Sequence, residues 1–88
     1  MQTLQINESV DLMIVLPDSV STDAPTYEIF DADGTVIQSG SLEFIRDEIW
    51  KVSDFTPDDV GLIVLKATNA TEFITQKRQN YYRVGRMA

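Results

Sequence analysis

Apolar and polar residues alternate with a period of two along most of this chain. Between Val10 and Leu16, every second side chain is aliphatic until Pro17 interrupts the pattern. No window keeps the i, i+3, i+4, i+7 spacing of an amphipathic helix for more than two turns. The alternation therefore predicts seven or eight β-strands, at residues 4–6, 10–16, 26–30, 35–38, 42–45, 49–55, 62–68 and 72–84.

Turn-forming residues separate these segments. Asp31-Ala-Asp-Gly34 is the strongest turn signal, because glycine adopts positive φ freely and aspartate side chains cap tight backbone. It predicts a hairpin between Thr26–Phe30 and Thr35–Gln38. Arg46-Asp-Glu48 predicts a second hairpin, which joins the strands at 42–45 and 49–55. Residues 56–60 contain at most one short helical turn.

Strands with one apolar face must be covered by another sheet, so the pattern predicts an all-β fold, and a two-sheet antiparallel β-sandwich is favoured over a small barrel. Trp50 is expected to anchor the core through its large area. The 88 residues suit a single domain spanning residues 1–88. Residues 1–7 and 83–88 are candidates for short arms that become ordered upon assembly.

The distribution of charge divides the chain in two. Residues 1–60 carry thirteen acids and two bases, whereas residues 61–88 carry five bases and one acid, within a net charge of −7. The overall acidity disfavours nucleic acid or an anionic membrane as a partner. The division is typical of a solvated face, and it also suits head-to-tail contacts between copies.

Reactive side chains are scarce. The sequence has no Cys and no His, which removes disulfides, the usual zinc sites and the common nucleophile–base pairs. We therefore expect neither an enzyme nor a cofactor. The Asp31–Asp33 turn could suggest calcium, but Ile29 and Gly40 stand where a calcium loop needs its first and last carboxylates, so a plain turn is expected. The apolar runs are too short to span a membrane, and no signal peptide is evident.

Several motifs carry a resemblance to a known class of domain. They are Tyr27-Glu-Ile-Phe-Asp-Ala-Asp-Gly34, Ser39-Gly-Ser-Leu42, Ile49-Trp-Lys-Val52, Phe55-Thr-Pro57 and Gly61-Leu-Ile-Val-Leu65. Together, over residues 26–68, they resemble immunoglobulin-like sandwich modules of bacteria and tailed bacteriophages. A free-standing module of this size resembles small virion proteins of those phages, namely head-tail connector or neck, adaptor, decoration and tail-associated subunits.

The resemblance implies a structural subunit that is made in the host cytoplasm and resides in the virion. Its partners would be other virion proteins and copies of itself in a symmetric ring or lattice. The alternative is a stand-alone binding module, carbohydrate-binding or adhesive, that reads its ligand through loops at Asp18–Pro25 and Thr56–Val60.

Apolar residues on the outward side of strands are the candidate contacts, since such residues in a group mark protein interfaces. The alternatives are that strand parity is misassigned or that loops cover these side chains. The C-terminal strand adds bases and aromatic rings, a composition typical of a nucleic-acid contact or of a protected sheet edge, and the protected edge is favoured. The candidate interface comprises Met13, Val15, Phe30, Leu62, Val64, Lys77, Arg78, Tyr81, Tyr82 and Arg83.

Overall fold

The computed structural model describes residues 2–86, which form eight β-strands and no helix. Accordingly, this part of the chain holds no helix of the length and apolarity needed to cross a membrane. The strands are β1 (Gln2–Gln5), β2 (Val10–Val15), β3 (Thr26–Phe30), β4 (Val36–Ser41), β5 (Glu43–Arg46), β6 (Ile49–Phe55), β7 (Gly61–Ala70) and β8 (Thr75–Gly85). The bounds of β3 and β6 are those predicted from the sequence.

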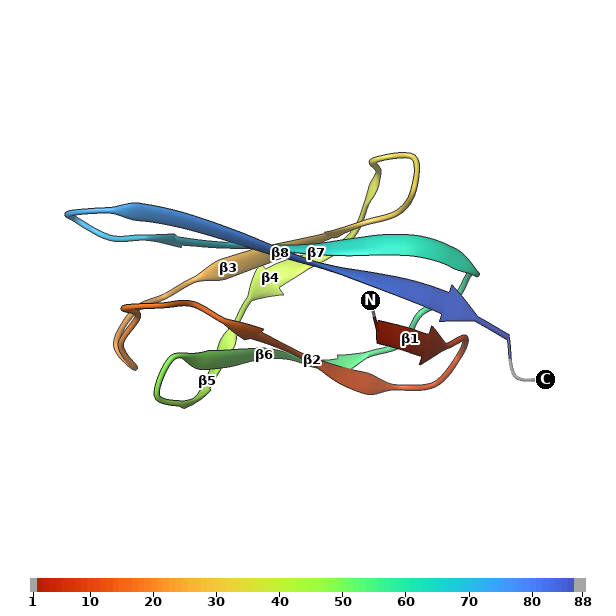
Figure 1. Ribbon diagram of the computed structural model, residues 1–88, viewed down its shortest axis with the longest axis horizontal. Coiled ribbons are helices and arrows are strands. Elements are labelled where there is room, and N and C mark those ends of the chain that lie inside the picture. Colours follow the sequence, from red (N-terminus) through yellow and green to blue (C-terminus); the bar gives the residue numbers. More distant parts are fainter. Residues whose placement is uncertain (1, 87–88) are drawn as a thin grey trace.

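The strands form two layers that face each other (Figure 1). One sheet has the order β1-β8-β7-β3-β4, and the other has the order β2-β6-β5. The two predicted hairpins are present as β3–β4 and β5–β6. This order is that of an immunoglobulin-like sandwich, in which strands B, E and D face strands G, F, C and C′. The predicted all-β sandwich is therefore confirmed, with one exception to antiparallel pairing.

That exception is β1, which pairs with β8 in parallel and places Gln2 beside Tyr82 and Gln5 beside Gly85. The prediction of free arms is therefore wrong for residues 2–5 and 83–85. The physical reason is that Leu4 is buried in the core and the backbone completes a ladder with β8. Ile6 and Asn7 are also tied to the body, because their amides donate to the carbonyls of Gly85 and Pro57. Arg86 is exposed and follows β8, and the remaining arm residues 1, 87 and 88 lie outside the described part of the chain.

Trp50 lies at the centre of the interlayer core, where only 2% of its surface is exposed. Its Nε1–H donates a hydrogen bond to Ser19 Oγ over 2.8 Å, and that hydroxyl donates to the Leu16 carbonyl over 2.6 Å. Phe44 packs edge-on against the indole with ring centroids 5.1 Å apart. Trp50 thus stabilises the sandwich by polar contacts as well as by area. The side chains that alternate with the outward candidates on β2, β3 and β7 point into the core, because Leu12, Ile14, Tyr27, Ile29, Ile63, Leu65 and Ala67 are buried, as is Leu16 just after β2.

Two of the intervals left between the predicted strands, at residues 39–41 and 69–70, are themselves strand. Ser39-Gly-Ser41 belongs to β4, where the Tyr27 ring crosses Gly40 so closely that an added Cβ would lie 3.3 Å from the ring. Asn69 belongs to β7 and is buried. Its polar side chain is tolerated there because its Nδ2 donates a hydrogen bond to an Asp23 carboxylate oxygen over 3.1 Å. Residues 56–60 form no helical turn, and the Pro57 carbonyl accepts a bond from the Asn7 amide.

Replacing Ser19 by Ala should lower the free energy of unfolding by about 1–3 kcal/mol, because it leaves the buried indole N–H of Trp50 without its acceptor. Urea unfolding monitored by tryptophan fluorescence measures the loss. Ser21→Ala is the matched control, since Ser21 is exposed, and should change stability by less than about 0.5 kcal/mol. Equal losses in the two variants would contradict the role given to the hydroxyl.

Candidate interaction surface

The outer face of the five-stranded sheet carries an apolar row that crosses four strands. Tyr81 of β8 is paired with Val64 of β7, Val64 with Phe30 of β3, and Phe30 with Val36 of β4. Tyr81 and Val36 are 47% and 43% exposed, and the two between them are half-buried. Leu62, also exposed, extends the row along β7. Paired positions share a face, so these side chains form one surface, called here the apolar row.

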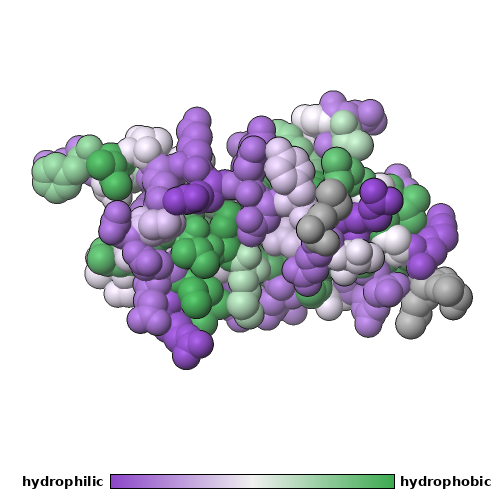
Figure 2. Space-filling view, viewed as in Figure 1, coloured by the Kyte–Doolittle hydropathy of each residue, from purple (hydrophilic) through white to green (hydrophobic). Residues whose placement is uncertain are grey.

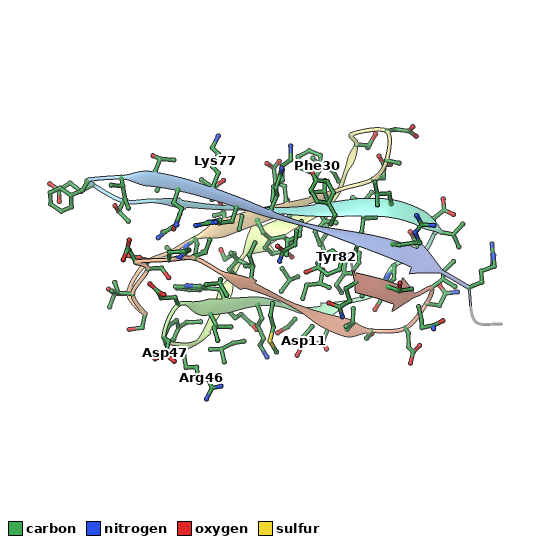
Figure 3. All side chains as sticks on the ribbon, in the orientation of Figure 1. Asp11, Phe30, Arg46, Asp47, Lys77 and Tyr82 are labelled. Atoms are coloured by element: carbon green, nitrogen blue, oxygen red, sulfur yellow. The ribbon has the colours of Figure 1, made fainter. Side chains whose placement is uncertain are left out.

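Positive side chains border the apolar row. Lys66 Nζ lies 4.9 Å from the centroid of the Phe30 ring, which is a cation–π contact. Lys77 and Arg83, on either side of Tyr81 along β8, point to the same outer face of the sheet as Tyr81 does. Figure 3 shows Phe30 and Lys77 on the side of the sheet that faces away from the second layer. Glu28, which is paired with Lys66, lies on the same face. The arrangement is an apolar centre with a polar rim in which bases outnumber the acid.

A second surface lies at the open side of the sandwich, between β2 and β8. Met13, Val15 and Arg78 line a depression there together with Ile14, Ile49, Gln79 and Asn80. Asn80 Nδ2 donates to the Met13 carbonyl over 3.3 Å and so links the two layers. Figure 2 shows apolar surface between the two layers on this side. The depression is open rather than enclosed, which fits an elongated partner better than a small ligand.

The ten candidate residues therefore separate into three groups. Six of them share the outer face of the five-stranded sheet: Phe30, Leu62, Val64, Lys77, Tyr81 and Arg83. Met13, Val15 and Arg78 lie at the open side instead. The prediction for Tyr82 is wrong, because its side chain is only 4% exposed and points between the layers (Figure 3). The adjacent Tyr81 occupies the outward position, since neighbouring strand residues face opposite ways.

The Asp31–Asp33 turn uses its carboxylate within the loop. One oxygen of Asp31 accepts hydrogen bonds from the amides of Asp33 and Thr35, both over 2.9 Å, while Gly34 adopts a φ of 85°. Among residues 2–86, no group of three or more Asp, Glu, His or Cys side chains is placed to hold a metal ion. The turn has the hydrogen bonds of an Asx turn that closes a hairpin.

The two loops of the alternative binding module lie at opposite ends of β7. Thr56–Val60 leads directly into Gly61, whereas Asp23 contacts Asn69 eight residues further along that strand. At about 3.3 Å per residue the separation is roughly 26 Å. The fold therefore does not bring these loops into one site.

Sequence reasoning missed Val36, which ends the apolar row at β4. The signal was the consecutive pair Val36-Ile37, which breaks the alternation because a bulge follows the β3–β4 hairpin at this point. Both side chains are exposed as a result. Recognising the bulge requires the exact register between β3 and β4, which the alternation alone does not give.

Comparison with known proteins shows the fold. The chain matches no protein-family model and no curated protein sequence. Over its whole length it superposes on the crystal structure of CopC from Methylosinus trichosporium OB3b, with a TM-score of 0.68, 10% sequence identity and 88% of that chain covered. It also superposes on a candidate glycoside hydrolase from Bacteroides vulgatus ATCC 8482, with a TM-score of 0.67 and 8% identity. It spans only 17% of the latter chain, and at these identities the similarity concerns the fold alone.

Tyr82 should make the protein less stable at alkaline pH. Burial raises the pKa of its phenol above the ordinary value, although the hydrogen bond with Asn80 acts in the opposite direction. As the pH rises, the unfolded chain therefore loses the Tyr82 proton first, at about pH 10. The neutral buried phenol contributes to stability in full below that pH, and this contribution is lost as the pH rises through the pKa of the folded state. Measured by urea unfolding between pH 8 and 11, Tyr82→Phe should show a shallower alkaline decline than the wild type.

Tyr81→Phe is the matched control for this measurement, because Tyr81 is the adjacent, exposed phenol. It should retain the wild-type decline. If Tyr82→Phe and Tyr81→Phe have the same alkaline slope, the buried position assigned to Tyr82 is wrong.

Proposed function

We propose that this protein is a non-catalytic structural subunit that works through protein–protein contacts. The observation that carries the proposal is the apolar row from Tyr81 to Val36, which stands on the outer face of a rigid sheet. Single exposed apolar residues are common, but a contiguous set across four strands is typical of an interface. A charged rim in which bases predominate gives orientation and speeds encounter with an acidic partner.

The residue inventory supports a binding role over a reactive one. Because the sequence has no His and no Cys, it lacks the common nucleophile–base pairs and zinc ligands, and its side chains are suited to protein contacts instead. Its acids are concentrated in residues 1–60 and its bases in residues 61–88, which supplies complementary surfaces for neighbouring subunits. A repeated joint adds modest contacts many times over in a ring or lattice.

We propose the virion of a tailed phage as the setting, with the chain as a head-tail connector or neck, adaptor, decoration or tail-associated subunit. The support is the set of motifs at residues 26–68 that resembles immunoglobulin-like phage modules. The partners would be other virion proteins and further copies of this chain. The similarity to CopC and to the candidate glycoside hydrolase supports the sandwich and carries no activity over to this chain.

Purification of intact particles from cultures that produce the protein tests this setting. Quantitative mass spectrometry should find the chain at a fixed number of copies per particle, and gold labelling in electron microscopy should place it at one position. A protein that stays monomeric and is absent from purified particles would contradict the virion role.

The apolar row is tested by the double variant Val36→Thr and Tyr81→Ser, which replaces exposed apolar surface by hydroxyls without touching the core. The two substitutions shorten the apolar row from both ends; loss of one or two strong contacts of an interface weakens binding by about 10- to 100-fold, so incorporation into particles should fall by that order. Ile45→Thr on β5 is the control, since it makes a similar change on the other sheet and should leave incorporation unchanged. If the wild type, the double variant and Ile45→Thr are incorporated equally, the apolar row is not the contact surface.

A further inference from the structure

The five-stranded sheet has two incompletely paired edges. Within residues 2–86, β4 pairs with β3 alone, so its far edge faces outward. On the opposite side, β1 covers β8 only from Tyr82 to Gly85, and Thr75–Tyr81 pairs with β7 alone in the described chain. Each edge presents backbone N–H and C=O groups that another strand could satisfy.

These two edges lie at the same level of the sheet. Following the register from β4 through β3 and β7 to β8, Gln38 stands level with Asn80, Ser39 with Gln79, Gly40 with Arg78 and Ser41 with Lys77. The open part of β8 therefore matches β4 in both length and position. If a second copy is placed beside the first at the same level, β4 meets the uncovered segment of β8 and not the segment that β1 covers.

The strand directions also fit. The pairs β8–β7, β7–β3 and β3–β4 are all antiparallel, so β4 runs opposite to β8 within one copy. A neighbouring copy in the same orientation therefore presents its β8 antiparallel to β4. The sheet continues across the joint with the pairing mode that it uses inside each copy.

Charge favours this combination over pairing of like edges. The β3–β4 turn carries two acids, Asp31 and Asp33, and residues 31–41 carry no base, whereas the segment 75–83 of β8 carries three bases and no acid. Pairing two β8 edges would bring Lys77 and Arg78 of both copies together, at a cost in repulsion. The strand β4 itself has no charged residue and no proline, which are the usual protections of a sheet edge against pairing.

We propose that copies of this chain join head to tail, with the β4 edge of one copy paired antiparallel to residues 77–80 of β8 in the next. This inference rests on the proposed structural role and specifies a second copy as the partner at the sheet edges. The joint uses different surfaces on the two copies, so it leaves one free edge at each end. Repetition closes a ring if the rotation per copy allows it and otherwise produces a filament.

Engineered disulfides test the register, because the chain has no cysteine of its own. Two single variants, Ser39→Cys and Gln79→Cys, are mixed under mild oxidation and the covalent dimer is followed on non-reducing gels. Both positions are exposed. Opposed residues of an antiparallel pair lie about 4.5–5.5 Å apart, which matches disulfide geometry. The mixture should form the mixed dimer about tenfold faster than either variant forms a dimer with itself.

Ser41→Cys mixed with Gln79→Cys is the register control. This pair is diagonal in the proposed joint, about 7–8 Å apart, which is beyond the range of an unstrained disulfide. Within one copy, three strand spacings of about 4.8 Å separate β4 from β8, so the link between Ser39 and Gln79 forms only between copies. If the Ser39–Gln79 pair links no faster than the control, or if Ser39→Cys links fastest to itself, the proposed joint is wrong.

The disulfide experiment tests the edge joint separately from the proposed structural role, because each can fail without the other. Loss of incorporation in the apolar-row variant without the Ser39–Gln79 link would refute the edge joint and leave the structural role intact. The link without any association with particles would support self-assembly and refute the virion setting.

Discussion

The unpaired backbone N–H and C=O groups at the edges of the sheets are the constraint on which the proposed contacts between subunits depend. In the described chain, β4 has a partner on one side only, and β1 is too short to cover all of β8. A small sandwich buries its apolar faces between layers but has no further strand with which to close its edges. The exposed rims are therefore where an assembly of such subunits can gain ordered, directional contacts.

Side-chain placement reinforces this geometry. Trp50 and its bond to Ser19 hold the two layers together, so the outer face is a stable platform. On that platform, the apolar row supplies area and Lys66 packs over Phe30. Bases cluster near the uncovered half of β8 and acids flank β4, which gives opposite ends of the sheet opposite charge. Contact area, direction and charge thus all support the proposed role in assembly.

The alternation of residues sufficed to predict the fold class, both short hairpins and the inward faces of the strands, because burial imposes a period of two. Features that depend on distant partners were beyond its reach. Gly40 lies in a strand because the ladder with β3 extends to it, where the Tyr27 ring covers it, and residues 2–5 form a strand because β8 offers a ladder. Tyr82 was misplaced because two adjacent tyrosines give no parity signal. The apolar row was only partly predicted, since Val36 joins it through a bulge.

Amide hydrogen exchange at different protein concentrations tests most directly whether the sheet edges are sites of assembly. The account predicts that alternate amides of residues 38–41 and 77–80 exchange freely in dilute protein and become protected together as concentration rises, while amides of β5 remain unchanged. Protection that does not depend on concentration, or that appears at β5 and not at β4 and β8, would contradict it.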